Sequence, residues 1–183
     1  MKERPNLNEL AKEIYEANKK KGFHDKEQSN EHYLCLVISE LMEAVEADRK
    51  ELRAKYEMHN DITHLDDEGY FNEPAFRHCI KDTLEDELAD AIIRLLDLAG
   101  LRGLEQFDAD FGEILIKDQL LTENIIVIID ILRDKRFELY LNIECAINNI
   151  GLLCQHLNID IWRHVELKIM YNATRERLHG KKY

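Results

Sequence analysis

The chain has 183 residues, of which 45% are hydrophobic and 34% are charged, and its formal net charge is −12 at pH 7. This acidic balance argues against binding of a nucleic-acid polymer, although a nucleotide can still be held through a metal ion. The chain has only 7 Gly and 2 Pro, an excess of helix-forming residues and no sustained period-two alternation. The sequence therefore predicts an all-α protein, and we expect 1–183 to form one domain.

The sequence carries no targeting or membrane signal. Its N-terminal residues lack the apolar core of a signal peptide, and no uninterrupted apolar run approaches the length of a membrane span. We therefore expect a cytoplasmic protein that does not associate with membranes. The four cysteines form no CxxC pair, and we expect them to be reduced, buried and structural.

The first predicted helix covers residues 6–20. Apolar residues recur at helical spacing from Leu7 to Ile14, and Gly22 is placed to end the helix. Phe23 follows, and we expect it in the core; the alternative is that it stacks on a nucleobase. The adjacent pair His24 and Asp25 is too short a motif to indicate a metal site.

A second helix is predicted from Glu31 to Arg49, EHYLCLVISELMEAVEADR, and it is strongly apolar. Within it Glu40 and Glu43 stand three residues apart, so both carboxylates share one side of the helix. Residues 56–77 follow with poor hydrophobic periodicity and several His and Asp residues. A polar segment of this length is either a lid or specificity element or a solvated insertion.

Residues 83–100, TLEDELADAIIRLLDLAG, predict the helix around which the chain is organised. The helix is apolar on nearly every side except for a narrow seam formed by Glu87, Asp90, Arg94 and Asp97. Such a helix should be buried, and a buried carboxylate without a partner is strongly unfavourable. The simplest partner is a metal ion.

Side by side, these two helices would place four carboxylates around one cavity. We expect Glu40, Glu43, Glu87 and Asp90 to bind a metal ion there. An oxygen-only ligand set, without His or Cys at matching spacing, favours a hard cation. Mg²⁺ is the usual choice beside phosphates, with Mn²⁺ as a substitute.

Two further apolar helices are predicted at 120–133, with Thr122 as its cap, and at 139–157. The sequences of these two helices loosely resemble those of the earlier pair. The carboxylates do not recur, because Glu40 aligns with Asn124 and Glu43 with Val127. Such a degenerate internal repeat predicts an acidic metal-binding half, about 1–103, and a degenerate half with a C-terminal basic helix, about 104–183. Convergence between two antiparallel helix pairs is the alternative.

The last predicted helix, 161–178, carries positive charge. Asn172, Arg175 and two histidines lie within about 40° of Lys168 around the helix axis, and Lys181 follows near the same end. Beside four carboxylates and a divalent ion, such cations would neutralise a polyphosphate. We therefore expect Lys168, Asn172, Arg175 and Lys181 to bind substrate; the alternative is a stripe that serves solubility.

With ISELMEAVEADRK, EDELADAIIRLLDLAG and KIMYNATRERLHGKKY in view, the chain resembles the MazG-like proteins of the all-α nucleoside triphosphate pyrophosphohydrolase superfamily. The degenerate second half resembles the dimeric dUTPase-type relatives. The family pattern of metal ligands is ExxE on one helix and ExxD on a later one. It maps here onto Glu40 and Glu43, then Glu87 and Asp90.

The resemblance implies a helical bundle that hydrolyses a nucleoside triphosphate between its α and β phosphates, giving the monophosphate and pyrophosphate. A metal-bound water would attack the α phosphorus, and Glu40 or Glu43 would act as the base. The family's contacts to the triphosphate would fall on Lys168, Asn172 and Arg175. The gap between the acidic motifs is longer than in compact family members, which leaves the choice of base and sugar open.

Two other function classes compete with this interpretation. A carboxylate-bridged di-iron bundle needs two ExxH motifs, and only Glu176 with His179 fits. The second class is a non-catalytic helical domain that binds nucleotide or a partner helix; the intact acidic motifs argue against it. We also expect a homodimer or higher homo-oligomer, because the helices carry more apolar surface than one small bundle hides.

Overall fold

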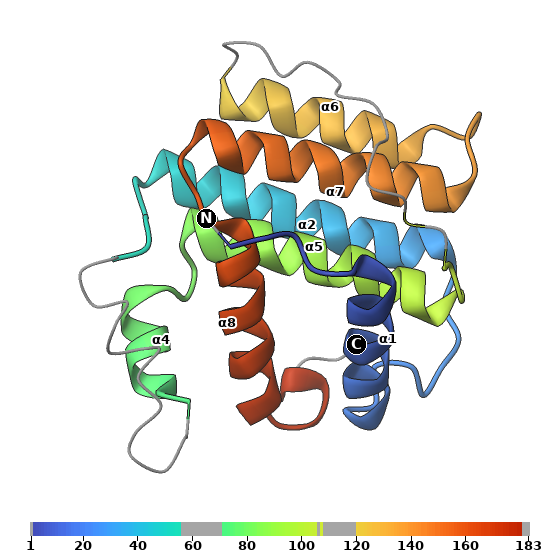
Figure 1. Cartoon of the computed structure of the whole chain (residues 1–183), viewed down its shortest axis with the longest axis horizontal. Coiled ribbons are helices and arrows are strands. Elements are labelled where there is room, and N and C mark those ends of the chain that lie inside the picture. The colour runs from blue at the N-terminus through green and yellow to red at the C-terminus, as the bar shows by residue number, and fades with distance from the viewer. Residues whose placement is uncertain (1, 56–70, 106, 108–119, 181–183) are drawn as a thin grey trace.

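The computed structural model describes residues 2–55, 71–105, 107 and 120–180, and every regular element within them is helical (Figure 1). The prediction of an all-α protein is confirmed. The helices are α1 (Leu7–Lys20), α2 (Asn30–Arg49), α4 (Glu73–Cys79), α5 (Leu84–Leu101), α6 (Leu121–Arg133), α7 (Leu139–His156) and α8 (Ile161–Thr174), and the short 3₁₀ helix η2 (Arg177–Gly180) follows.

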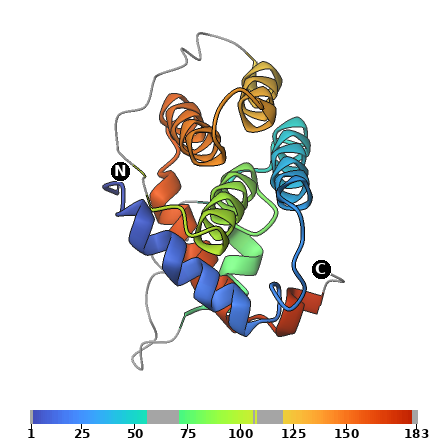
Figure 2. The same cartoon turned by 90° about the vertical axis from the view of Figure 1, so that its right-hand side faces the viewer.

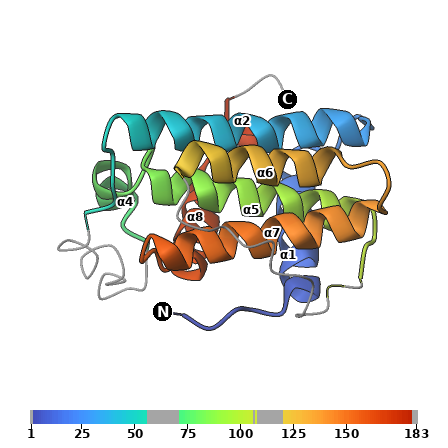
Figure 3. The ribbon, with the colours of Figure 1, turned by 90° about the horizontal axis from the view of Figure 1, so that it is seen from above.

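α5 lies at the centre of the molecule (Figure 2). α2, α5, α6 and α7 run side by side, while α1 and α8 cross α5 on the side away from α6 (Figure 3). α5 packs against α1, α2, α7 and α8, and 14 of its 18 residues are buried. The prediction of a buried helix over 83–100 is confirmed, because neighbours cover α5 on nearly every side.

Two small residues fix how α5 begins and how α1 crosses it. Thr83 is the N-cap, and its hydroxyl accepts a hydrogen bond from the backbone N–H of Asp86 at 3.4 Å. Near the other end, a Cβ atom on Gly100 would lie 2.5 Å from the carbonyl oxygen of Ala11 and 2.6 Å from Cβ of Tyr15. Only glycine therefore lets α1 approach α5 this closely.

α8 is shorter than predicted, because the chain turns after Thr174. The ammonium group of Lys21 donates to the carbonyl oxygen of Ala173 at 3.1 Å and to that of Arg175, and the Lys21 carbonyl accepts from the backbone N–H of Leu178 at 3.0 Å. These bonds satisfy carbonyls at the helix end. The predicted continuation of the helix to 178 is wrong, and Arg175 is the C-cap.

α6 begins at Leu121, with Leu120 as its N-cap. The carboxylate of Glu123 accepts a hydrogen bond from the backbone N–H of Leu120 at 2.9 Å. Thr122 lies inside the helix, so its predicted role as the cap is wrong.

Part of the polar segment 56–77 is folded against the body of the protein. Its last residues begin α4, in which Phe76 and Cys79 are buried. The Phe76 ring stacks on that of Tyr171 in α8, with 4.6 Å between centroids. This part is not a solvated insertion; residues 56–70, which carry the rest of the lid hypothesis, lie outside the described residues.

Two expectations about the surface can be compared with the structure. Cys79 and Cys154 are buried, Cys145 is partly buried and Cys35 is exposed, and all four are free thiols. The expectation of burial is therefore wrong for Cys35. Within the described parts of the chain, none of the helices combines the length and the apolar character that crossing a membrane requires.

Candidate functional site

Three of the four predicted metal ligands meet between α2 and α5. One carboxylate oxygen each of Glu40, Glu87 and Asp90 can be chosen so that all three lie within 4.8 Å of one another. The ExxD spacing places Glu87 and Asp90 on one side of α5, and α2 packs against that helix and supplies Glu40. A set of carboxylate oxygens at this separation has the donor chemistry of a hard divalent cation.

Burial disfavours the charged forms of Glu87 and Glu40 in this carboxylate group. Burial, followed by the neighbouring Asp86 carboxylate, raises the pKa of Glu87 to about 9. Burial also raises the pKa of Glu40, although the Arg94 guanidinium opposes this shift. At neutral pH the group therefore holds a proton that a divalent cation would displace. The residues present could therefore hold a divalent cation.

Glu43 lies outside the group of three. It is exposed on α2, one turn from Glu40, and is close enough for its charge to raise the pKa of Glu40. The structure therefore places Glu43 at the rim, where it can reach water more readily than the buried Glu40 and Glu87 can.

Lys168 lies inside the protein and not on an open stripe. Its Nζ lies 2.7 Å from Oδ2 of Asp86 and 2.9 Å from Oδ2 of Asp90. Burial acts to lower the pKa of Lys168, but the charges of Asp90 and Asp86 outweigh it and hold the pKa above its usual range. Lys168 thus contributes its positive charge to the acidic site from within.

Asp86 is a site residue that the sequence analysis did not single out. Burial raises its pKa to about 6, against the opposing charge of Lys168. With Asp82 and Glu87, it forms a second set of carboxylates that could hold a cation. The available signal was its place in the first turn of a helix that is apolar on nearly every side.

The remaining predicted substrate ligands do not share one open face with Lys168. Asn172 is half-buried. Arg175, beyond the end of α8, donates to the carbonyl oxygen of His179 at 3.1 Å and has its guanidinium carbon 5.6 Å from the centre of the Tyr171 ring. Lys181 lies outside the described residues.

Arg94 joins the carboxylate group to a pocket. Its Nη2 lies 2.5 Å from Oε1 of Glu40, and its side chain also lines a pocket of about 300 Å³. Phe23, Tyr33 and Leu36 supply aromatic and apolar walls. Phe23 is thus half-buried at this pocket and, contrary to our expectation from the sequence, does not belong to the hydrophobic core. From the sequence, the first helix, the segment 56–77 and Trp162 are the candidates for a pocket wall. No residue of α1 or α4 lines this pocket, and Trp162 does not line it either.

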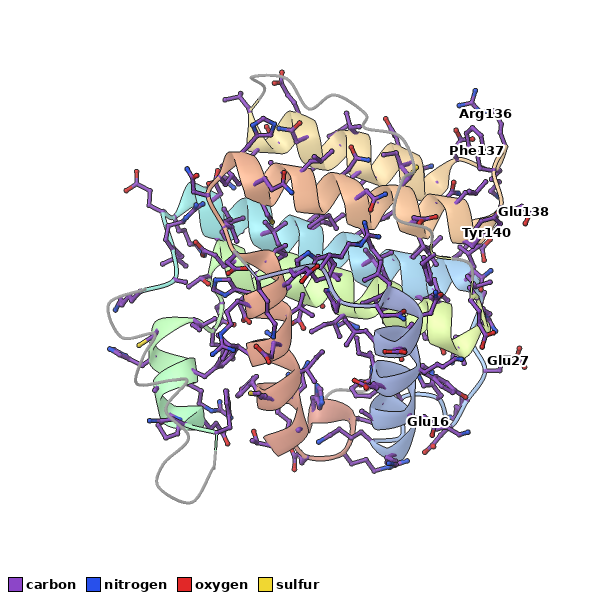
Figure 4. The ribbon with its side chains drawn as sticks, viewed as in Figure 1. Glu16, Glu27, Arg136, Phe137, Glu138 and Tyr140 are labelled. Carbon is purple, nitrogen blue, oxygen red and sulfur yellow. The ribbon has the colours of Figure 1, made fainter. Side chains whose placement is uncertain are left out.

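The pocket carries charge of both signs. Lys26, Arg94 and Arg177 line it together with Asp25 and Asp97. Arg177 is paired with Asp25. A broader, shallow depression of about 570 Å³ lies at the start of α2 around Glu27 and Arg102, and Glu27 projects away from the protein there (Figure 4). Neither a residue of the carboxylate group nor Arg94 lines this depression, so we assign it no role in the site.

His24 and Asp97 form a pair that sequence reasoning missed. His24 Nε2 lies 2.9 Å from Oδ1 of Asp97, and His24 Nδ1 lies 3.3 Å from the hydroxyl oxygen of Tyr33. Burial, followed by the charge of Asp97, raises the pKa of Tyr33, so its hydroxyl stays protonated. Nothing in the sequence signals this pairing, because 73 residues separate His24 from Asp97.

Comparison of the chain with protein-family models, with curated proteins and with solved structures found no match.

Proposed function

We propose that the protein is a Mg²⁺-dependent nucleoside triphosphate pyrophosphohydrolase of the MazG-like type. The observation that carries this proposal is the approach of Glu40, Glu87 and Asp90 within 4.8 Å inside a helical core. Two further features support it: Arg94 bridges these carboxylates to a pocket, and the pocket has aromatic walls. A metal–nucleotide complex requires acidic metal ligands, then a positively charged side chain such as Arg94, then an aromatic pocket, next to one another in space.

Glu40, Glu87 and Asp90 would hold the cation. When bound, a divalent ion supplies polarisation of phosphate oxygens and a coordinated water of lowered pKa. Glu43, at the rim, would take the proton from the attacking water. Lys168 would hold the Asp90 carboxylate in place through its ion pair, and Arg94 has five N–H donors with which to face Glu40 and phosphate oxygens together.

The architecture also supports the finer fold hypothesis. α2 with α5 and α6 with α7 run side by side as two pairs (Figure 3), as a degenerate repeat would. Met42, Ile126 and Phe137 are 42%, 55% and 57% exposed, which is consistent with a homodimer. We retain the helical bundle with a degenerate repeat and the homodimer as parts of the proposal, together with a cytoplasmic location.

One observation favours the non-catalytic alternative. Because Lys168 is already paired with Asp86 and Asp90, less positive charge faces a triphosphate than the sequence predicts. The di-iron alternative has no comparable support, since Glu176 and His179 follow the end of α8. We do not retain it.

A panel of ribo- and deoxynucleoside triphosphates separates the two remaining functions. The protein is incubated with each compound in Mg²⁺ or in EDTA, and pyrophosphate and orthophosphate are measured separately. Pyrophosphate release that EDTA abolishes supports the hydrolase. Nucleotide binding without release of either product would move the assignment to a binding domain.

A further inference from the structure

The polar end of the pocket is a chain of three side chains. Asp97 and Tyr33 line the pocket, and His24, whose side chain is only 3% exposed, lies behind both. One imidazole nitrogen faces the Asp97 carboxylate at 2.9 Å and the other faces the Tyr33 hydroxyl at 3.3 Å. The rings of Tyr15 and Tyr33 lie 5.2 and 5.9 Å from the imidazole and fix its position.

The hydrogen bonds in this chain can run in one direction only while His24 is neutral. The nitrogen that faces the carboxylate must carry the proton, so Nε2 donates to Asp97. Nδ1 is then an acceptor, and the Tyr33 hydroxyl donates to it. The proton on His24 Nε2 and the proton of the Tyr33 hydroxyl are therefore both used in hydrogen bonds within this set of three side chains. Asp97 and Tyr33 therefore present lone pairs to the pocket, and the His24 bond takes only one of about four acceptor positions on the carboxylate.

Asp97 lies at a distance from the carboxylate group that one nucleotide can span. Asp90 and Asp97 are seven residues apart on α5, which corresponds to about 10 Å along the axis and to nearly the same side of the helix. Arg94 lies between them and contacts both the pocket and Glu40. A nucleotide whose phosphates lie at the carboxylates would therefore extend its base towards Asp97.

We propose that Asp97 selects a guanine base, an inference that rests on the proposed function. Guanine is the common base with two adjacent N–H donors, N1–H and the N2 amino group, on one edge, and both can donate to one carboxylate. Adenine and cytosine place a ring nitrogen acceptor beside their amino group, and uracil and thymine flank a single N–H with two carbonyl groups. A carboxylate repels each of these acceptors. His24 is a positioning residue that orients Asp97.

The test compares kcat/KM for guanine, hypoxanthine, xanthine, adenine, cytosine and uracil nucleoside triphosphates in Mg²⁺. Hypoxanthine lacks the N2 amino group, so we expect guanine to exceed it by about tenfold or more. Asp97→Asn replaces one acceptor by a donor, which matches the C2 carbonyl and N1–H of xanthine. We expect this variant to reverse the order of guanine and xanthine. Preference for another base, or a parallel loss for all bases, would overturn the proposal.

Two variants serve as controls. Asp130→Asn removes one negative charge at an exposed position of α6 and should leave the order unchanged. If Asp97→Asn loses its helical circular dichroism, His24→Asn replaces it: Asp97 is retained without its orienting bond, and the guanine-to-hypoxanthine ratio should fall towards one. An unchanged ratio would overturn the proposal.

A binding measurement separates this proposal from the proposed function. The affinities of guanosine, inosine and xanthosine monophosphates are measured in EDTA, where no turnover occurs. If guanosine monophosphate binds more tightly than the other two and no triphosphate is hydrolysed, the base assignment is supported and the proposed hydrolase function is contradicted. Hydrolysis with a preference for a base other than guanine would support the hydrolase function and contradict the assignment of guanine.

Discussion

Lys168 and Asp86 form an ion pair inside the protein, with 2.7 Å between Nζ and Oδ2. The side chains are 5% and 1% exposed, and the same ammonium lies 2.9 Å from Asp90. The last long helix is thus tied by charge to the central helix, next to the candidate metal ligands. This pair links the stability of the fold to the charge state of the site.

Removal of Lys168 should destabilise the protein strongly. Lys168→Met leaves the buried Asp86 and the partly buried Asp90 without their cation, and breaking a buried ion pair typically costs about 3–5 kcal/mol. Denaturant unfolding measures the change in the free energy of unfolding. Lys135→Met removes the same charge from an exposed position and should change that free energy little. A loss below about 1 kcal/mol for Lys168→Met would contradict the buried pair.

Metal-free protein should lose stability as the pH rises from about 5 to about 9. The pKa of Glu87 is about 9 in the folded state against an ordinary value of 4.5. Between these values the folded state holds more protons than the unfolded state, so the free energy of unfolding falls with increasing pH. The pKa of Asp86, about 6, adds to the lower part of this slope.

Thermal unfolding in EDTA at several pH values measures this slope. Glu87→Gln should flatten its upper part, because the variant has no proton to lose there. Addition of Mg²⁺ at pH 8.5 should stabilise the wild type. An unfolding profile that is the same for wild type and Glu87→Gln would show that Glu87 does not titrate as described.

Glu43→Gln should reduce turnover without weakening Mg²⁺ binding. Glu43 lies at the rim, outside the group of Glu40, Glu87 and Asp90, and a general base contributes at least about a hundredfold to kcat. Steady-state kinetics and a Mg²⁺ titration measure the two effects. Glu46→Gln, exposed on the same helix, is the matched control. Unchanged kcat in Glu43→Gln would remove Glu43 from the mechanism.

Two glycine substitutions should have opposite effects on stability. Gly100→Ala brings a Cβ atom within 2.5 Å of the Ala11 carbonyl oxygen, so α1 must move, at a cost of about 1–3 kcal/mol. At Gly151, in α7, a Cβ atom would meet nothing within 4 Å. Gly151→Ala should therefore stabilise the protein by about 0.5–1 kcal/mol. Similar denaturation midpoints for the two variants would contradict the close crossing of α1 and α5.

The helices could be predicted because their signals are local. The bounds of α1, α2, α5, α6 and α7 follow from apolar periodicity, and the three-residue spacing within ExxE and ExxD places carboxylates on one side of a helix. The meeting of Glu40, Glu87 and Asp90 then needed one further step, the packing of α2 on α5.

The features that escaped prediction depend on partners distant in the sequence. The end of α8 is set by Lys21, and the pairing of Lys168 with Asp86 joins residues 82 positions apart. A helical wheel places Lys168 on a polar stripe but contains no information on what packs against that stripe. His24 lies in a short connection without periodicity, so only the folded chain brings it to Asp97.

The most direct test of the proposed hydrolysis is the fate of the water oxygen. A nucleoside triphosphate that the protein consumes is hydrolysed in ¹⁸O-labelled water with Mg²⁺, and the products are analysed by mass spectrometry. Attack at the α phosphorus predicts ¹⁸O in the nucleoside monophosphate and unlabelled pyrophosphate. Label in orthophosphate alongside a nucleoside diphosphate, or no Mg²⁺-dependent incorporation, would contradict it.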